Sequence, residues 1–300
     1  MNQLLNDLVE TANSRSADGE SLFAGDRIGS LPFRALSGNV SGAGGQVITN
    51  VMYTGGMASN RAEVSEGSFV NTGFAGNEVF WAEYNEVLSD NDASTYVVQE
   101  DSAILIDGVS IDLRAGDNVH AVMAKINDSP AAARAELDPV NNSLVIRATT
   151  PHQLWLEDAQ SGTVLQDLGI VTSFGNPPHN IAPDARTSGG SVFDMVIFMR
   201  DQLYNGETLD VGGAGLKGID IAQNNLITSI AEIGSRYERL DFVSNRIDAE
   251  IPEITQRNSQ EVDIDITRAI TDLKMYEYTH KAALATAGRI LQPTLLDFLR

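Results

Sequence analysis

The residue types that could carry acid–base or metal chemistry are scattered along this chain. Its four histidines lie far apart and lack the spacing of a metal-binding pair: His120, His152, His179 and His280. We expect each of them to be solvent-exposed or to have a packing role. The absence of cysteine excludes disulfides, thiol catalysis and cysteine–zinc sites.

Other segments resemble site motifs only in part. Residues 42–45 are glycine-rich like a phosphate-binding loop, but no Lys-Ser or Lys-Thr pair follows them. Residues 89–92 suggest a calcium loop, yet counting from Asp90 gives neither the glycine nor the glutamate that such a loop requires. Asp263 and Asp265 would lie on different faces of a helix. No serine occupies a G-x-S-x-G turn. The sequence therefore predicts no catalytic residue, no cofactor and no metal site.

Composition and charge narrow the class of protein. The 300 residues include 41 acidic and 20 basic ones, and the resulting formal charge of −21 repels nucleic acid. No apolar run approaches the roughly 18 residues of a membrane span, and the first residues have no features of a secretory signal. A hydrophobic fraction of 42% is typical of a folded chain, and the length suggests about two domains. We expect neither nucleic-acid nor membrane partners.

The first third of the chain predicts one helix followed by β-structure. Residues 2–15 form an amphipathic pattern without an N-cap, and a β-hairpin is expected over 17–33. Glycine is frequent over 39–87, where short alternating runs indicate strands and loops. The polar residues 88–95 are expected to be a linker.

The clearest local signal is the Asp107-Gly108 pair between two alternating runs. This composition predicts a type I′ hairpin over residues 103–113. The elements expected after it are a helix over 118–126, strands over 132–137, 144–148 and 154–156, a helical turn over 164–170, a loop over 172–190 and a helix over 191–204. Together, the elements up to residue 170 indicate a small α+β insert.

The longest pattern is a heptad repeat of apolar residues. The positions alternate in steps of four and three, with one polar interruption at Ser244: Leu226, Ile230, Ile233, Tyr237, Leu240, Ile247, Ile251 and Ile254. Most helical stripes are part of a domain core. A helix over 218–254 would, however, be about 55 Å long, and a seam of this spacing buries fully only against a second supercoiling helix. The pattern therefore favours a rod-forming or assembling protein.

A second helix is expected after a joint. Pro252 and the N-cap signal at Asn258 predict a kink between residues 250 and 262, with a helix over 259–291. Apolar residues continue into the last ten positions, where ordinary termini are polar. The predicted rod and assembly interface therefore adds to the heptad these residues: Ile270, Leu273, Leu284, Ile290, Leu291, Leu295, Leu296 and Phe298.

Several segments resemble the flagellin superfamily. Residues 270–278 and 282–299 are similar to the C-terminus of that superfamily, and the ending LQPTLLDFL resembles its hook-associated protein 3 branch, the hook–filament junction proteins. Three further groups of residues agree: 11–15 with 18–19 and 22–25, 192–194 with 203–206, and 106–108 with 124–127 and 165–169. The last group is similar to the flagellin hook IN motif, with Asp107 where Asn is usual.

The resemblance implies a structural subunit of the bacterial flagellum at the hook–filament junction. The implied fold is α+β, with a coiled-coil-like rod formed from the chain ends and a β-rich outer insert. The implied partners are copies of this chain, other flagellar hook-associated proteins and an export chaperone. The implied location is extracellular, after export without a cleaved signal peptide. The implied domains are 1–33, the end of the N-terminal rod helix with a hairpin; 34–172, the outer insert with an IN-like unit at 97–171; 173–258, the C-terminal rod helices; and 259–300, the polymerisation helix and tail.

One departure from the family concerns the start of the chain. Family members begin with a longer helical stretch, and Met1 falls near its end, so we expect this chain to lack the N-terminal rod helix. The chain is then either a fragment or one with a misassigned start. Two alternative functions stay open: a filament flagellin, and a secreted acidic adhesin or hydrolase that acts through its β-rich insert.

Overall fold

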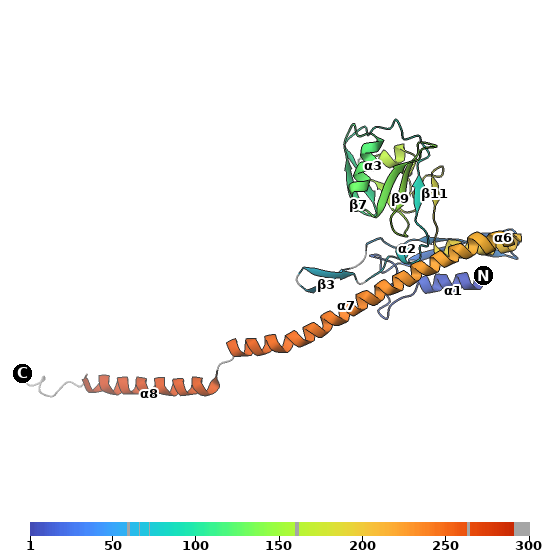
Figure 1. Cartoon of the computed structure of the whole chain (residues 1–300). Coiled ribbons are helices and arrows are strands. Elements are labelled where there is room, and N and C mark those ends of the chain that lie inside the picture. The colour runs from blue at the N-terminus through green and yellow to red at the C-terminus, as the bar shows by residue number, and fades with distance from the viewer. Residues whose placement is uncertain (59–60, 66, 72, 160–161, 263–264, 291–300) are drawn as a thin grey trace, which may run out of the picture. The chain divides into compact units, whose positions relative to one another are not determined.

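The computed structural model describes residues 1–58, 61–65, 67–71, 73–159, 162–262 and 265–290. Long helices combine with several small antiparallel sheets, so the fold belongs to the α+β class that the sequence predicted (Figure 1). The chain divides into two units, Met1–Glu238 and Arg239–Arg300. Within the first unit, we call residues 85–188 the insert, and residues 1–82 and 190–238 the base.

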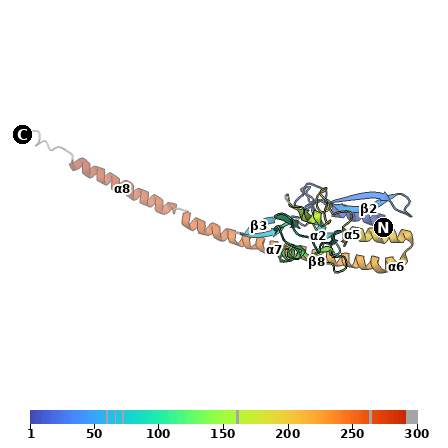
Figure 2. The ribbon, with the colours of Figure 1, turned by 90° about the horizontal axis from the view of Figure 1, so that it is seen from above.

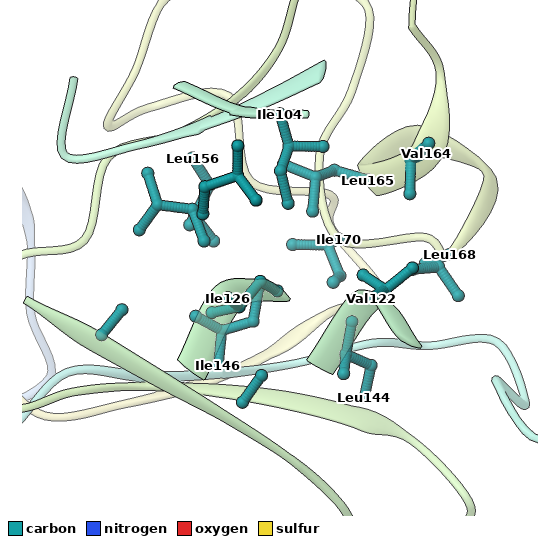
Figure 3. Close-up of a cluster of buried hydrophobic side chains, with 14 of the residues drawn as sticks. Ile104, Val122, Ile126, Leu144, Ile146, Leu156, Val164, Leu165, Leu168 and Ile170 are labelled. Carbon is teal, nitrogen blue, oxygen red and sulfur yellow. The ribbon is translucent and has the colours of Figure 1, made fainter. Parts of the chain in front are cut away.

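The insert contains two antiparallel sheets with a common core. One has the strand order β11 (Arg186–Ser188), β5 (Glu86–Leu88), β9 (Leu144–Ala148), β8 (Ala133–Leu137). The other has the order β10 (Leu156–Asp158), β6 (Ser102–Ile106), β7 (Val109–Leu113). Helix α3 (Val119–Asp128) and the short α4 (Val164–Asp167) complete it. Their buried side chains, among them Ile104, Ile126, Ile146 and Leu156, form the apolar cluster in Figure 3.

Local signals predicted several elements of the insert, but residues 88–95 are not the expected linker, because Leu88 belongs to β5 and Ser89 and Ala93 are buried. Asp107 and Gly108 both have positive φ angles, 52° and 76°, between the paired residues Ile106 and Val109, which confirms the type I′ hairpin. The Asn118 side chain caps α3 by accepting a hydrogen bond from the backbone N–H of Ala121 at 3.0 Å. Strand β11 lies in the segment expected to be a loop. All three of its residues are exposed, so no alternation marks it, and pairing with β5 defines it.

The base contains an aromatic core between its helices and its longest hairpin. Its elements are α1 (Asn2–Ala12), β1 (Phe33–Asn39), β2 (Gln46–Tyr53), β3 (Arg61–Ser65), β4 (Ser68–Asn71), α2 (Gly76–Val79), α5 (Val192–Asn205), α6 (Thr208–Asp210), the π-helical turn η1 (Val211–Gly215) and the start of α7 (Leu216–Val262). Helix α5 packs against α1 and β2 (Figure 2). Phe193 of α5 is fully buried. Its ring centroid lies 5.0 Å from that of Phe33 and 5.5 Å from that of Phe80. A capping box at Ser191 starts α5, which confirms the helix expected over 191–204.

The β-hairpin that the sequence predicted over residues 17–33 does not form as a regular strand pair. The segment has two isolated antiparallel bridges instead: Arg15 with Ser21, around Gly19 with its φ of 82°, and Ala24 with Ala75. The chain then continues through turns, because Ser21 donates its backbone N–H to the Ile28 carbonyl and not to a regular partner strand. The residues between Ser21 and Phe33 also lack the alternation of buried and exposed side chains that a strand needs.

A buried arginine ties three elements of the base together. The Arg200 side chain of α5 is only 2% exposed. Its Nε donates to Oδ1 of Asp201 at 2.8 Å, and its Nη1 donates to the Ile48 carbonyl of β2 at 2.6 Å. Nη1 also lies 3.5 Å from Oδ1 of Asn2 in α1. Because the guanidinium is removed from water, the Asp201 carboxylate is the charge that balances it.

Replacing Asp201 with alanine is expected to destabilise the base more than replacing Arg200 with methionine. The first change leaves a buried guanidinium without its counter-charge, at a cost of about 3 kcal/mol. The second removes the buried charge and keeps a side chain of similar length, while Asp201, about one-third exposed, stays hydrated. Urea unfolding followed by circular dichroism measures both. An Arg200→Met variant that is the less stable of the two would contradict this assignment.

Of the kink or joint expected between residues 250 and 262, the structure rules out an interruption of the helix. Helix α7 is continuous for 47 residues and contains Pro252, and Asn258 lies inside it and not at an N-cap. Proline removes one backbone bond of the helix, and an ion pair between Glu253 and Arg257 spans the turn that follows. The next helix, α8 (Ile266–Ile290), begins later than expected, where Oδ1 of Asp265 accepts the backbone N–H of Arg268 at 3.1 Å.

Candidate assembly surface

The heptad residues form an apolar stripe along α7 that solvent reaches. Because α7 is continuous, steps of four and three keep these side chains on one side of the helix. Leu226 is half-buried against the aromatic core of the base. The other members are exposed: Ile230, Ile233, Tyr237, Leu240, Ile247, Ile251 and Ile254. We call these seven exposed residues the α7 seam.

Helix α8 presents a second apolar series. Ile270, Leu273, Leu284 and Ile290 are all more than half exposed, and we call them the α8 series. No residue of α8 is buried in the chain itself. The remaining predicted interface residues, Leu291, Leu295, Leu296 and Phe298, lie outside the described residues, as do Asp263 and Ile264. Asp265 caps α8.

Sequence analysis missed several exposed apolar residues near this surface. Phe242 lies two positions after Leu240, on the other side of α7 from the seam, and is 68% exposed. Helix α8 exposes these further residues: Ile266, Met275, Tyr276 and Tyr278. Phe242 lies off the heptad spacing that marks the candidates on α7. The shared signal of the missed residues is a large apolar residue on a helix that lacks a buried face.

Several charged residues of α7 and α8 form ion pairs within their own helix. Ion pairs join Glu232 with Arg236, Arg246 with Glu250, Glu253 with Arg257, and Lys274 with Glu277. Such exposed pairs contribute little free energy, typically less than about 1 kcal/mol each. Helix α7 has five basic and eight acidic residues, and α8 has four basic and two acidic ones, so the two helices together have a net charge of only −1. Attraction to a partner would therefore come mainly from the apolar side chains.

The exposed area is large enough to drive association. The α7 seam and the α8 series contain eleven side chains, which are seven plus four. At about 1.5 kcal/mol each, their burial would contribute roughly 16 kcal/mol. Association costs about 4–15 kcal/mol in lost translational, rotational and side-chain freedom. The surface could therefore hold a helical partner, although each contact alone is weak.

The residues considered for chemistry occupy ordinary structural positions. Residues 42–45 lie in the turn between β1 and β2, and Asp92 accepts the backbone N–H of Ser94 at 2.8 Å. His120 and His280 are exposed. His179 lies 2.8 Å from the Tyr53 carbonyl through Nε2, and His152 pairs with Asp107. No cluster of three or more metal-binding side chains occurs among the described residues.

None of the described helices is both long and apolar enough to cross a membrane.

Comparison with known proteins gives partial likenesses. No family model matches the chain. It is 27% identical over 170 residues to flagellar hook-associated protein 2 of Thermotoga maritima, an alignment that covers 53% of this chain and 27% of that protein. The chain therefore spans about a quarter of the length of this curated relative.

Two solved structures are similar to most of this chain at low identity. FlgL of Xanthomonas campestris is 14% identical, with a TM-score of 0.43 over 86% of this chain and 79% of that one. Flagellar hook-associated protein 3 of Legionella pneumophila is 16% identical, with a TM-score of 0.40 over 87% of this chain and 79% of that one.

Proposed function

We propose that this chain is a structural subunit of the bacterial flagellum and lies at the hook–filament junction. The observation that carries the assembly role is the exposed α7 seam, continued by the α8 series. The similarity of residues 270–299 to the flagellin superfamily and the partial identity to a flagellar hook-associated protein support the flagellar location. The role needs no catalytic residue, cofactor or metal.

Assembly would proceed through the terminal helices. The α7 seam and the α8 series would pack against helices of neighbouring subunits, in the manner of a coiled coil. The tail, residues 291–300, would add its apolar side chains to the same interface. In this arrangement residues 34–172 face outwards, residues 173–258 contribute the rod, and residues 259–300 carry polymerisation.

The partners would be copies of the chain and other hook-associated proteins, with a chaperone that shields the apolar helices before export. An exposed surface of this size favours aggregation in a crowded cell, so a shielding partner has a clear physical purpose. The subunit would act outside the cell, after export without a cleaved signal peptide.

Deleting the gene in its host is expected to leave hooks on the cells and to release filament protein into the medium. A junction subunit is needed to attach the filament to the hook, but the cell can make and export the filament protein without it. Electron microscopy of the cells and immunoblotting of the medium measure both. Loss of the filament protein itself would indicate a filament flagellin, and a normal filament would contradict the proposed role.

A further inference from the structure

The base and the insert share a cavity that contains a buried histidine–aspartate pair. The cavity is about 600 Å³ and is lined by Glu78 of the base and by Asp107, His152 and Trp155 of the insert. The His152 side chain is 4% exposed and that of Asp107 is 8% exposed. Neither residue has a role in the proposed assembly surface, so the pair needs a separate explanation.

Nε2 of His152 faces a carboxylate oxygen, and Nδ1 faces both a carbonyl oxygen and a hydroxyl that can donate a hydrogen bond. Nδ1 lies 2.9 Å from the Thr150 carbonyl, and Nε2 lies 3.0 Å from Oδ2 of Asp107. The Thr150 hydroxyl is 3.1 Å from Nδ1. In either neutral tautomer one nitrogen lone pair would face a carbonyl or carboxylate oxygen. The imidazolium form, which donates from both nitrogens, satisfies both contacts.

Asp107 transmits this pairing to the contact between insert and base. Its Oδ1 accepts the backbone N–H of Trp155 at 3.1 Å, and its own backbone N–H donates to the Trp155 carbonyl at 3.0 Å. The Trp155 ring packs against the aromatic core of the base. The charged His152 ring therefore orients the Asp107 carboxylate, which in turn holds the backbone of Trp155 where the insert contacts the base.

Several charged groups around the His152–Asp107 pair affect the pKa of His152. Burial opposes the charge on His152, but the hydrogen bond and charge of Asp107, with the Thr150 carbonyl and Glu78, outweigh it and raise the pKa of His152. Burial also raises the pKa of Glu78, on which His152 and Arg236 act in the opposite direction. The charged groups around His152 are Asp107 from the β6–β7 turn, Glu78 from α2, Glu157 from β10, and Asp26 and Arg27 from the base. Glu232 and Arg236 of α7 act on Glu78.

We propose that His152 is a pH-operated latch that holds residues 150–155 of the insert against the base when it is protonated and releases them when it loses its proton. Deprotonation removes the charge of His152 from a cavity that is also lined by the Asp107 and Glu78 carboxylates. Trp155 and its segment then separate from the aromatic core, and the insert becomes mobile relative to the base.

The direction of the pH effect follows from the raised pKa of His152. A group whose pKa is higher in the folded state stabilises the fold fully below its unfolded value, about pH 6.5 for histidine. That stabilisation is lost as the pH rises through the higher folded value. Glu78 changes stability in the same direction, because its pKa is also raised on folding. The latch is therefore closed near pH 6 and open under alkaline conditions.

The first test follows the four histidines of the full chain by NMR as the pH is raised. The His152 ring is expected to lose its proton above the usual value for histidine, about pH 6.5. The signals are assigned with single His→Gln variants. A His152 that titrates at or below about pH 6.5 would overturn the latch.

The second test compares thermal unfolding of the wild-type chain and the His152→Gln variant at pH 6 and pH 9. We expect the variant to melt about 2–4 °C lower at pH 6 and at the same temperature as the wild type at pH 9. The His120→Gln variant is the matched control and should follow the wild type at both values. His179→Gln is a second control, because His179 also joins insert and base.

The third measurement is hydrogen exchange at the backbone amide of Trp155, corrected for the intrinsic effect of pH on exchange. Protection is expected to fall between pH 6 and pH 9 in the wild type and to be low at both values in His152→Gln. Equal protection at both pH values in the wild type would overturn the proposal. So would a pH effect that disappears in His179→Gln and persists in His152→Gln.

Discussion

Replacing Ile247, Ile251 and Ile254 of the α7 seam with lysine is expected to abolish self-association of this chain. All three side chains are exposed, so the substitutions leave the fold of the base and the insert unchanged. Each isoleucine would contribute about 1.5–3 kcal/mol when buried by a partner, so their loss weakens association by at least a thousandfold. Sedimentation velocity over a range of concentrations measures the effect, and motility of cells carrying the variant measures its consequence.

A matched variant separates the position of the lysines from their charge. Phe242, Ala249 and Gln256 are also exposed and follow each other at heptad spacing on the opposite side of α7. Lysine at these three positions adds the same charge but leaves the seam intact, so association should persist. Equal loss in both variants would mean that charge, and not the seam, decides assembly. Wild-type association of the Ile→Lys variant would remove the seam from the interface altogether.

Replacing Phe193 with alanine is expected to lower the free energy of unfolding by about 3–5 kcal/mol. The ring is fully buried and contacts Phe33 and Phe80, so its removal leaves a cavity that the surrounding strands and helices cannot fill. Because α5 packs against α1 and β2, the loss affects the whole base. Urea unfolding followed by circular dichroism gives the free energy.

Phe174 provides the control for that substitution. Its side chain is 84% exposed, so Phe174→Ala removes the same atoms without emptying a buried site. The expected change in the free energy of unfolding is within about 0.5 kcal/mol. A loss of less than about 1 kcal/mol for Phe193→Ala would show that the aromatic cluster does not organise the base.

Elements that depend on neighbouring residues could be read from the sequence alone. Asp107-Gly108 permits the positive φ angles of a type I′ turn, and the Asn118 side chain reaches a backbone N–H only three residues away. The α7 seam is also a local property, because its spacing is set by the geometry of a single helix. These features need no information about distant parts of the chain.

Features that depend on distant contacts appear only in the tertiary structure. The burial of Arg200 requires the Ile48 carbonyl from β2, and the His152–Asp107 pair joins residues 45 positions apart. Strand β11 exists through its pairing with β5 across the insert. Pro252 predicted a kink or joint from its local cost alone, whereas the helix on both sides continues through it. The local sequence thus determined features such as the type I′ turn, the Asn118 cap and the α7 seam. Tertiary folding decided which polar groups are buried, because desolvation depends on neighbours that the local sequence does not contain.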